Sequence, residues 1–182
     1  MKDKEIELKF IINKEIKNAI LSDNIENFEK ISSSRVIDTY YIPNFKDFEI
    51  NGETMECLRI REDKNGLTLT YKKIHRECDP IYCDEYETKI EDAGQMEKIL
   101  FSLGFSVQMK IDKTRETYRL NNLEFDFDTI ENLGELLEIE LKDELSTVEQ
   151  IYDFVSKYGL TKNDVTYKGI QVLMKEAMKN KK

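Results

Sequence analysis

Apolar and polar residues alternate with a period of two along much of the chain, the pattern of β-strands that present one face to a core. Turn-forming pairs such as Asn51-Gly52 and Asn65-Gly66 separate several of these stretches. We therefore predict eight strands, at residues 6–12, 36–42, 55–62, 67–73, 84–90, 113–120, 123–129 and 136–141. Apolar residues recur at helical spacing in four further segments, at residues 15–21, 93–103, 147–158 and 164–178, and Ser146 is the expected N-cap of the third.

Many strands with few helices between them favour an antiparallel α+β protein, because parallel strands need a long crossover at each step. A length of 182 residues suits one domain. Eight antiparallel strands can close into a barrel. The sequence thus predicts a single α+β domain over residues 1–182, built on a closed eight-stranded antiparallel β-barrel flanked by helices.

The polar faces of the predicted strands are strongly charged, and most of them carry one sign. The first strand places Glu5, Glu7 and Lys9 opposite Ile6, Leu8 and Phe10. The later faces carry Arg59 and Arg61, Lys72, Glu85 and Glu87, Lys113 and Arg115, Asp126 and Asp128, and Glu138 and Glu140. Such faces usually meet solvent. The repetition across seven strands, rich in arginine, favours an inverted barrel whose charged face lines a central tunnel.

These charges fall into two chemical groups. Carboxylate oxygens are the ligands that Mg²⁺ and Mn²⁺ prefer, and the candidates are Glu5, Glu7, Asp128, Glu138 and Glu140, with Glu85, Glu87 and Asp126 in support. The basic candidates for binding a polyanion are Lys9, Arg59, Arg61, Lys72, Lys113 and Arg115. A triphosphate chelated to a divalent cation needs both groups, so the set indicates a triphosphate substrate.

The composition of the chain limits the kinds of binding partner that we expect. The formal net charge of -9 argues against non-specific binding to nucleic acid or to an anionic membrane. We find no apolar segment typical of a signal peptide or a membrane span. Cys57, Cys78 and Cys83 form no CxxC pair, and a single histidine cannot build a conventional zinc site. We expect a cytoplasmic protein with free thiols.

Several motifs together resemble one known family. Glu5-Ile6-Glu7-Leu8-Lys9 is an ExExK strand, and Asp38-Thr39-Tyr40-Tyr41, Leu58-Arg59-Ile60-Arg61 and Leu69-Thr70-Tyr71-Lys72 follow it in order. The segment from Asp128 to Glu140 is similar to a D-x-V-x-x-LG-x-F-x-E-I-E pattern. These motifs resemble the CYTH superfamily, or triphosphate tunnel metalloenzymes, and the LRIR and LTYK details are most similar to its class IV adenylyl cyclases.

The resemblance implies a divalent-metal-dependent enzyme, with Mg²⁺ or Mn²⁺, that converts ATP to cyclic AMP and pyrophosphate. Hydrolysis of inorganic triphosphate, thiamine triphosphate or nucleoside triphosphates is the alternative, and a non-catalytic triphosphate- or polyphosphate-binding module is a third reading. Glu138 and Lys9 are the expected catalytic residues, although a metal-bound hydroxide could serve as the base in place of Glu138. The family also makes a homodimer plausible.

One position departs from the family pattern. Cys83 stands where the family often has an arginine before its E-x-E pair, which here is Glu85 and Glu87. The upstream Arg76 could replace that phosphate donor only if the loop around Pro80 folds back.

Overall fold

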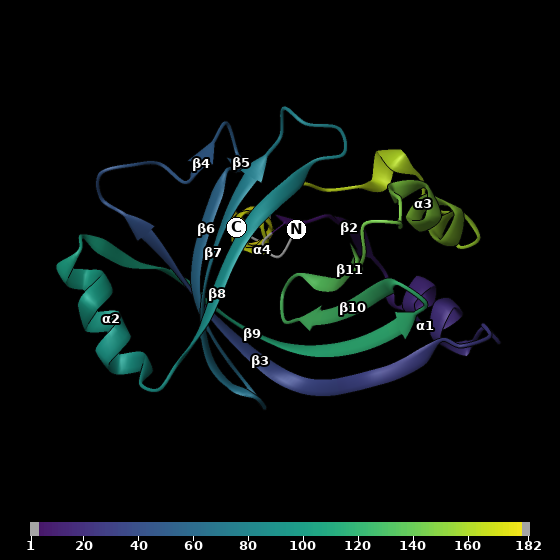
Figure 1. Ribbon diagram of the computed structural model, residues 1–182, viewed down its shortest axis with the longest axis horizontal. Helices are drawn as coiled ribbons and strands as arrows, with labels where there is room; N and C mark the ends of the chain where they lie inside the picture. Colours follow the sequence, from purple (N-terminus) through teal and green to yellow (C-terminus); the bar gives the residue numbers. More distant parts are fainter. Residues whose placement is uncertain (1–3, 180–182) are drawn as a thin grey trace. The chain divides into compact units, whose positions relative to one another are not determined.

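The structure, a computed structural model, describes residues 4–179 (Figure 1). Its strands are β1 (Lys4–Glu5), β2 (Glu7–Ile12), β3 (Glu29–Pro43), β4 (Glu49–Ile50), β5 (Glu53–Thr54), β6 (Glu56–Asp63), β7 (Gly66–His75), β8 (Tyr82–Ile90), β9 (Phe105–Leu120), β10 (Leu123–Ile130) and β11 (Gly134–Leu141). Its helices are α1 (Lys14–Ser22), α2 (Ala93–Ser102), α3 (Val148–Ser156) and α4 (Ile170–Lys179), with one 3-10 turn, η1 (Lys162–Asp164).

Nine strands form one antiparallel sheet in the order β1-β8-β7-β6-β3-β9-β10-β11-β2, and β4 pairs with β5 in a separate hairpin. The two ends of this order, β1 and β2, are separated in the chain by Ile6 alone. The topology is therefore that of a nearly closed antiparallel β-barrel. The eight predicted strands are all present, the first of them divided at Ile6, and the α+β prediction is confirmed.

The chain divides into two compact units. Unit 1 comprises the residues up to Glu5, Arg35–Asp112 and the residues from Lys168 onward. Unit 2 comprises Ile6–Ser34 and Lys113–Tyr167. β3 and β9 each continue from one unit into the other. The single-domain expectation stays a prediction.

The core of unit 2 lies on the apolar face of its strands. Phe10, Phe125, Phe127 and their neighbours on β2, β10 and β11 pack against apolar side chains of α1 and α3, including Ile151. Each such side chain, when fully buried, contributes about 1.5–3 kcal/mol. Because period-two alternation sends the next residue to the other face, this core forces the charged side chains of the same strands together on the opposite face.

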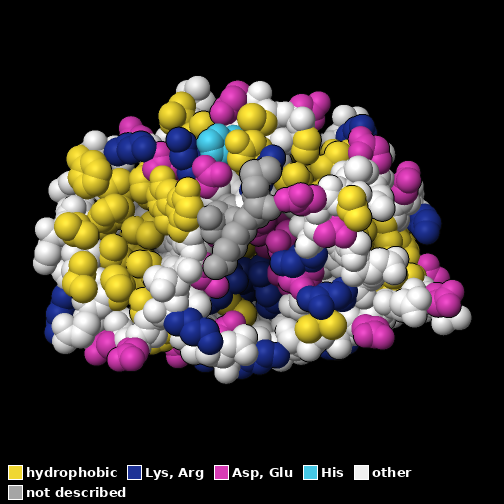
Figure 2. Space-filling model, viewed as in Figure 1, with side chains coloured by type: hydrophobic (Ala, Val, Ile, Leu, Met, Phe, Trp, Pro, Cys, Tyr) yellow, Lys and Arg dark blue, Asp and Glu magenta, His cyan; other side chains and the backbone are white. Residues whose placement is uncertain are grey.

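The core of unit 1 is smaller. Tyr41, Phe48, Leu58 and Ile60 pack with Leu100 of α2. On the face shown in Figure 2, hydrophobic side chains gather over the part of the molecule where α2 lies in Figure 1. No helix among the described residues combines the length and the apolar character that a membrane span requires.

Two helix predictions are wrong at their starts. Thr147, and not Ser146, caps α3, because the Ser146 hydroxyl donates to Asp143. The fourth helix begins at Ile170 and not near residue 164, since Thr161 and Asp164 form a capping box around η1. At Gly169, just before α4, an added Cβ would lie 2.7 Å from the Thr54 hydroxyl and even closer to Gln171, so any other residue would force these side chains to move.

Candidate functional site

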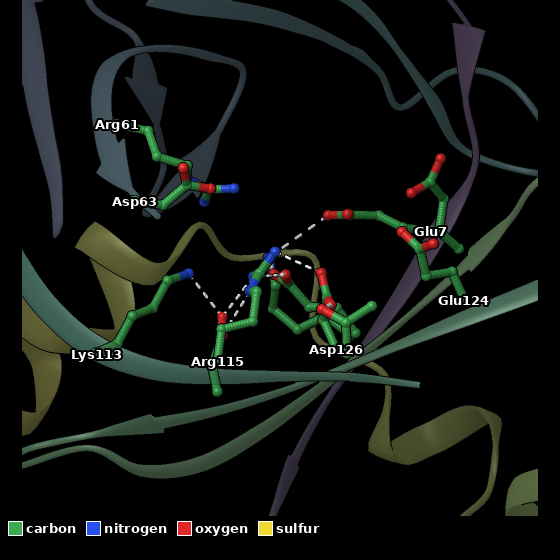
Figure 3. A network of polar contacts seen from close by, with 12 residues as sticks. Glu7, Arg61, Asp63, Lys113, Arg115, Glu124 and Asp126 are labelled. Atoms are coloured by element: carbon green, nitrogen blue, oxygen red, sulfur yellow. Dashed lines mark hydrogen bonds and ion pairs between the residues drawn. The ribbon is translucent and has the colours of Figure 1, made fainter. Parts of the chain in front are cut away.

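A charged network centred on Arg115 lies on the sheet face of unit 2 opposite its apolar core. Arg115 of β9 is directly opposite Asp128 of β10 in the sheet register. Its Nε donates to Asp128 Oδ1 at 2.7 Å, its Nη2 donates to Glu138 Oε2 at 2.7 Å, and its Nη1 donates to Asp126 (Figure 3). Three carboxylates from two neighbouring strands therefore converge on one guanidinium.

Two lysines complete this network. Lys113 donates to Asp128 Oδ2 at 2.6 Å, and both side chains are fully buried. Lys9 of β2 lies 3.0 Å from Glu138, its register partner on β11, and 3.7 Å from Glu7. Three cations thus face three central carboxylates, so the network is close to neutral before any ligand binds.

The network shifts the pKa values of its members. Burial raises the pKa of the Glu138 carboxyl, but Lys9, Arg115 and Lys113 together hold it well below its ordinary range. Burial likewise acts against the charged forms of Asp128 and Arg115, yet their mutual attraction lowers the pKa of Asp128 and raises that of Arg115. At Asp126 burial prevails over Arg115, and the pKa is raised. Glu138 and Asp128 are therefore charged in the folded protein at neutral pH.

Three glutamates lie side by side on β10, β11 and β2, two residues along β11 from Glu138. Glu140 of β11 is directly opposite Glu7 on one side and Glu124 on the other. Like charges in adjacent register positions repel each other. Lys142 lies 2.9 Å from Glu140 and 3.8 Å from Glu124, which shows that a cation is accommodated beside this row. Glu124 was not among the predicted residues, because only the strand register places it next to Glu140.

The predicted basic residues of unit 1 also have carboxylate neighbours. Arg61 donates through two nitrogens to Asp38, and Arg59 lies 4.0 Å from both Asp38 and Glu85. Lys72 contacts Glu5 and lies 3.5 Å from Glu85. Glu87 accepts a hydrogen bond from Thr70 at 2.9 Å. Asp38 was noted in the sequence as part of a motif but not as a site residue, and its register opposite Arg61 places it in the site.

The position that departs from the family pattern has a definite environment. Cys83 is buried, and its Sγ donates to Glu5 Oε2 at 3.0 Å, the same oxygen that Lys72 contacts. All three cysteines are free thiols, as predicted. Arg76 donates to the Thr54 carbonyl at 2.7 Å and lies 3.6 Å from Glu53. The role of Arg76 as a replacement phosphate donor stays a prediction.

The donor set fits a hard divalent cation in its chemistry, although the described residues 4–179 hold no group of three or more His, Cys, Asp or Glu side chains arranged as metal ligands. The reason is visible in unit 2, where Arg115, Lys113 and Lys9 already engage the central carboxylates. The positions of Arg115 and Lys142 show that positive charge is stable among these oxygens. The assignment of metal ligands stays a prediction.

Known proteins are similar to this chain in sequence and in fold. A Methanocaldococcus jannaschii protein, named as a candidate adenylate cyclase, is 30% identical over 136 residues, or 72% of this chain and 76% of the relative. The solved structure of the Pyrococcus horikoshii protein PH1819 is 30% identical, with a TM-score of 0.77 over 94% of this chain and 98% of that chain.

A Hippeastrum protein shares the fold at 16% identity, with a TM-score of 0.63 over 96% of this chain and 95% of that chain. That protein is described as a candidate adenylyl cyclase with a dominant triphosphatase activity. The family model described as the CYTH domain matches residues 3–169, almost the whole length. The chain therefore belongs to the CYTH domain family.

Proposed function

We propose that this protein is a divalent-metal-dependent enzyme that acts on the triphosphate group of a nucleotide, with the conversion of ATP to cyclic AMP and pyrophosphate as the leading reaction. The observation that carries the proposal is the network of unit 2, in which buried cations and carboxylates alternate around Arg115. The name of the Methanocaldococcus jannaschii relative supports the cyclase over other triphosphate reactions.

The charge balance of the network supports the proposal that the polyanion and the metal bind together. Lys9, Lys113 and Arg115 are neutralised by the central carboxylates, so a triphosphate with roughly four negative charges can bind only if these cations turn to its phosphates. The carboxylates that they leave must then find another positive partner. The predicted metal ligands in unit 2 are Glu7, Asp128, Glu138 and Glu140, and Glu5 is the predicted ligand in unit 1.

The protein's contribution to the reaction is positioning and charge. When bound, Mg²⁺ or Mn²⁺ would offset the charge of the phosphates and polarise the phosphorus that reacts. Lys9, Lys113 and Arg115 would hold the phosphate chain extended, and Glu138 is the predicted acceptor of the proton that the ribose 3′-hydroxyl loses. Arg59, Arg61 and Lys72 are predicted to bind phosphate from unit 1.

Triphosphate hydrolysis is the second candidate, because the same network suits attack by water on the terminal phosphorus. The Hippeastrum protein, described as having a dominant triphosphatase activity, is similar to this chain in fold at 16% identity. The two reactions differ in which phosphorus meets the nucleophile.

One incubation series distinguishes these readings. ATP, tripolyphosphate and thiamine triphosphate are each incubated with Mg²⁺ or Mn²⁺, and all products are separated. Cyclic AMP with pyrophosphate identifies the cyclase, whereas orthophosphate with ADP or pyrophosphate identifies the triphosphatase. Tight binding with no product under either metal would refute an enzyme and leave the binding module. Glu138→Gln should abolish any activity, and Glu29→Gln, an exposed glutamate of β3, is the matched control.

A further inference from the structure

Asp38 of β3 stands apart from the other carboxylates beside the basic residues of unit 1. Its side chain is 0% exposed, and it is directly opposite Arg61 of β6 in the register. Arg61 Nε donates to Asp38 Oδ1 at 2.7 Å, and Arg61 Nη2 donates to Asp38 Oδ2 at 2.9 Å. This two-point contact fixes the plane of the guanidinium as well as its position.

The accessible partner in this pair is the cation. The side chains of Arg61 and Arg59 are 14% and 12% exposed, whereas that of Asp38 is 0% exposed. Asp38 occupies two of the five N–H donors that a guanidinium carries. A ligand can therefore reach the remaining edge of Arg61 without meeting the carboxylate that supports it.

The contacts that Glu85 makes with the basic residues of unit 1 have a looser geometry. Glu85 is 25% exposed and lies 4.0 Å from Arg59 and 3.5 Å from Lys72, so both contacts are longer than hydrogen bonds. An entering anion can displace such a contact at little cost, because the glutamate can turn to solvent. Asp38 is 0% exposed, so its carboxylate cannot turn to solvent if Arg61 moves away.

We propose that Asp38 is the positioning residue that holds Arg61 with its free edge toward a triphosphate, an inference that rests on the proposed function. Whether neutralisation of Asp38 tightens or weakens triphosphate binding tests this role. If Asp38 acted only through its charge, its neutralisation would remove a negative group near the phosphates and tighten binding. If Asp38 positions Arg61, neutralisation places an amide against the guanidinium, breaks the two-point contact and weakens binding.

The test uses isothermal titration calorimetry of the full chain with tripolyphosphate, in the absence and presence of Mn²⁺. Asp38→Asn should weaken tripolyphosphate binding at least about tenfold, the effect of losing one charge-assisted hydrogen bond. Arg61→Ala should weaken it as well, and Asp38→Asn in the Arg61→Ala background should add little, because the same interaction is already lost. Asp38→Glu, which keeps the charge, should recover part of the affinity.

Asp112→Asn is the matched control. Asp112 accepts from Arg35 through two nitrogens in unit 1, yet both side chains of this pair are largely exposed. This variant should bind tripolyphosphate as the unmodified protein does. Unchanged or tighter binding by Asp38→Asn, or full additivity with Arg61→Ala, would overturn the positioning role, and a lowered Tm with unchanged affinity would show a structural role instead. Failure of the unmodified protein to bind tripolyphosphate would refute the proposed function and not this step alone.

Discussion

Replacing Arg115 with methionine tests whether the central carboxylates of unit 2 form a cation site. Arg115 contacts Asp126, Asp128 and Glu138. In the variant, Asp128 keeps Lys113 at 2.6 Å and Glu138 keeps Lys9 at 3.0 Å, so Asp126 loses its main ionic partner and retains a hydrogen bond from Thr117.

The magnitude follows from this one partly buried carboxylate. Breaking a buried ion pair by removing one partner costs about 3–5 kcal/mol. For a chain of this size, each kcal/mol lowers Tm by about 2–4 °C, so Arg115→Met should lower Tm by roughly 6–20 °C. Arg119→Met is the control on the same strand, and its exposed pair with Glu124 is worth at most about 1 kcal/mol.

Divalent cations should partly rescue the variant. In the unmodified protein a metal ion must compete with the guanidinium, whereas in Arg115→Met the same oxygens are left without it. Ligand present at one hundred times its dissociation constant stabilises a protein by about 2.7 kcal/mol. Thermal unfolding with and without Mn²⁺ at constant ionic strength should therefore show a larger Tm increase for Arg115→Met than for the unmodified protein. Equal increases in the two proteins would refute a cation site among these carboxylates.

The remaining predictions concern turnover, pH and packing. Glu138→Gln should retain the fold, by circular dichroism, and lose turnover in the product assay; full activity would remove Glu138 from the site. His75, the only histidine, has its pKa raised by its hydrogen bond to Asp84, so the stability that it contributes is complete below about pH 6.5 and is lost as pH rises through its folded-state pKa. Urea unfolding from mildly acid to mildly alkaline pH should show this decline, and a decline of equal size in His75→Gln would contradict it. Phe125→Ala should cost about 3–5 kcal/mol in urea unfolding, whereas Phe45→Ala, at a side chain that is 68% exposed, should cost far less, and similar values would contradict the packing described for unit 2.

The strands could be predicted because alternation is a local signal, but their lengths could not. β3 begins at Glu29, although the polar segment 29–35 has no apolar alternation. It continues as a strand because it pairs with β9, to which Lys30 and Arg35 are tied by ion pairs with Glu116 and Asp112. The two-residue strands β4 and β5 are likewise too short to carry a pattern. Strand length here depends on tertiary pairing, which single-sequence reasoning does not contain.

For the candidate site, the sequence predicted which side chains lie together but not how they pair. Period two identified which side chains share a face, and the register then placed Arg115 opposite Asp128 and Lys9 opposite Glu138. The sequence could not show that the oppositely charged groups pair with each other. From the sequence, the carboxylates were predicted to bind metal and the cations to bind phosphate. In the structure, the carboxylates and the cations are each other's counter-ions.

This pairing changes how binding should be understood. A count of basic residues overstates the affinity for a triphosphate, because each cation must first leave a carboxylate. In unit 2 that exchange exposes Asp128 and Glu138, and a divalent cation is the partner that can compensate them. Binding of the triphosphate and of the metal must therefore favour one another by the same factor. In unit 1, the proposed role of Asp38 is to keep Arg61 in place through two hydrogen bonds, while the longer contacts of Glu85 with Arg59 and Lys72 can exchange.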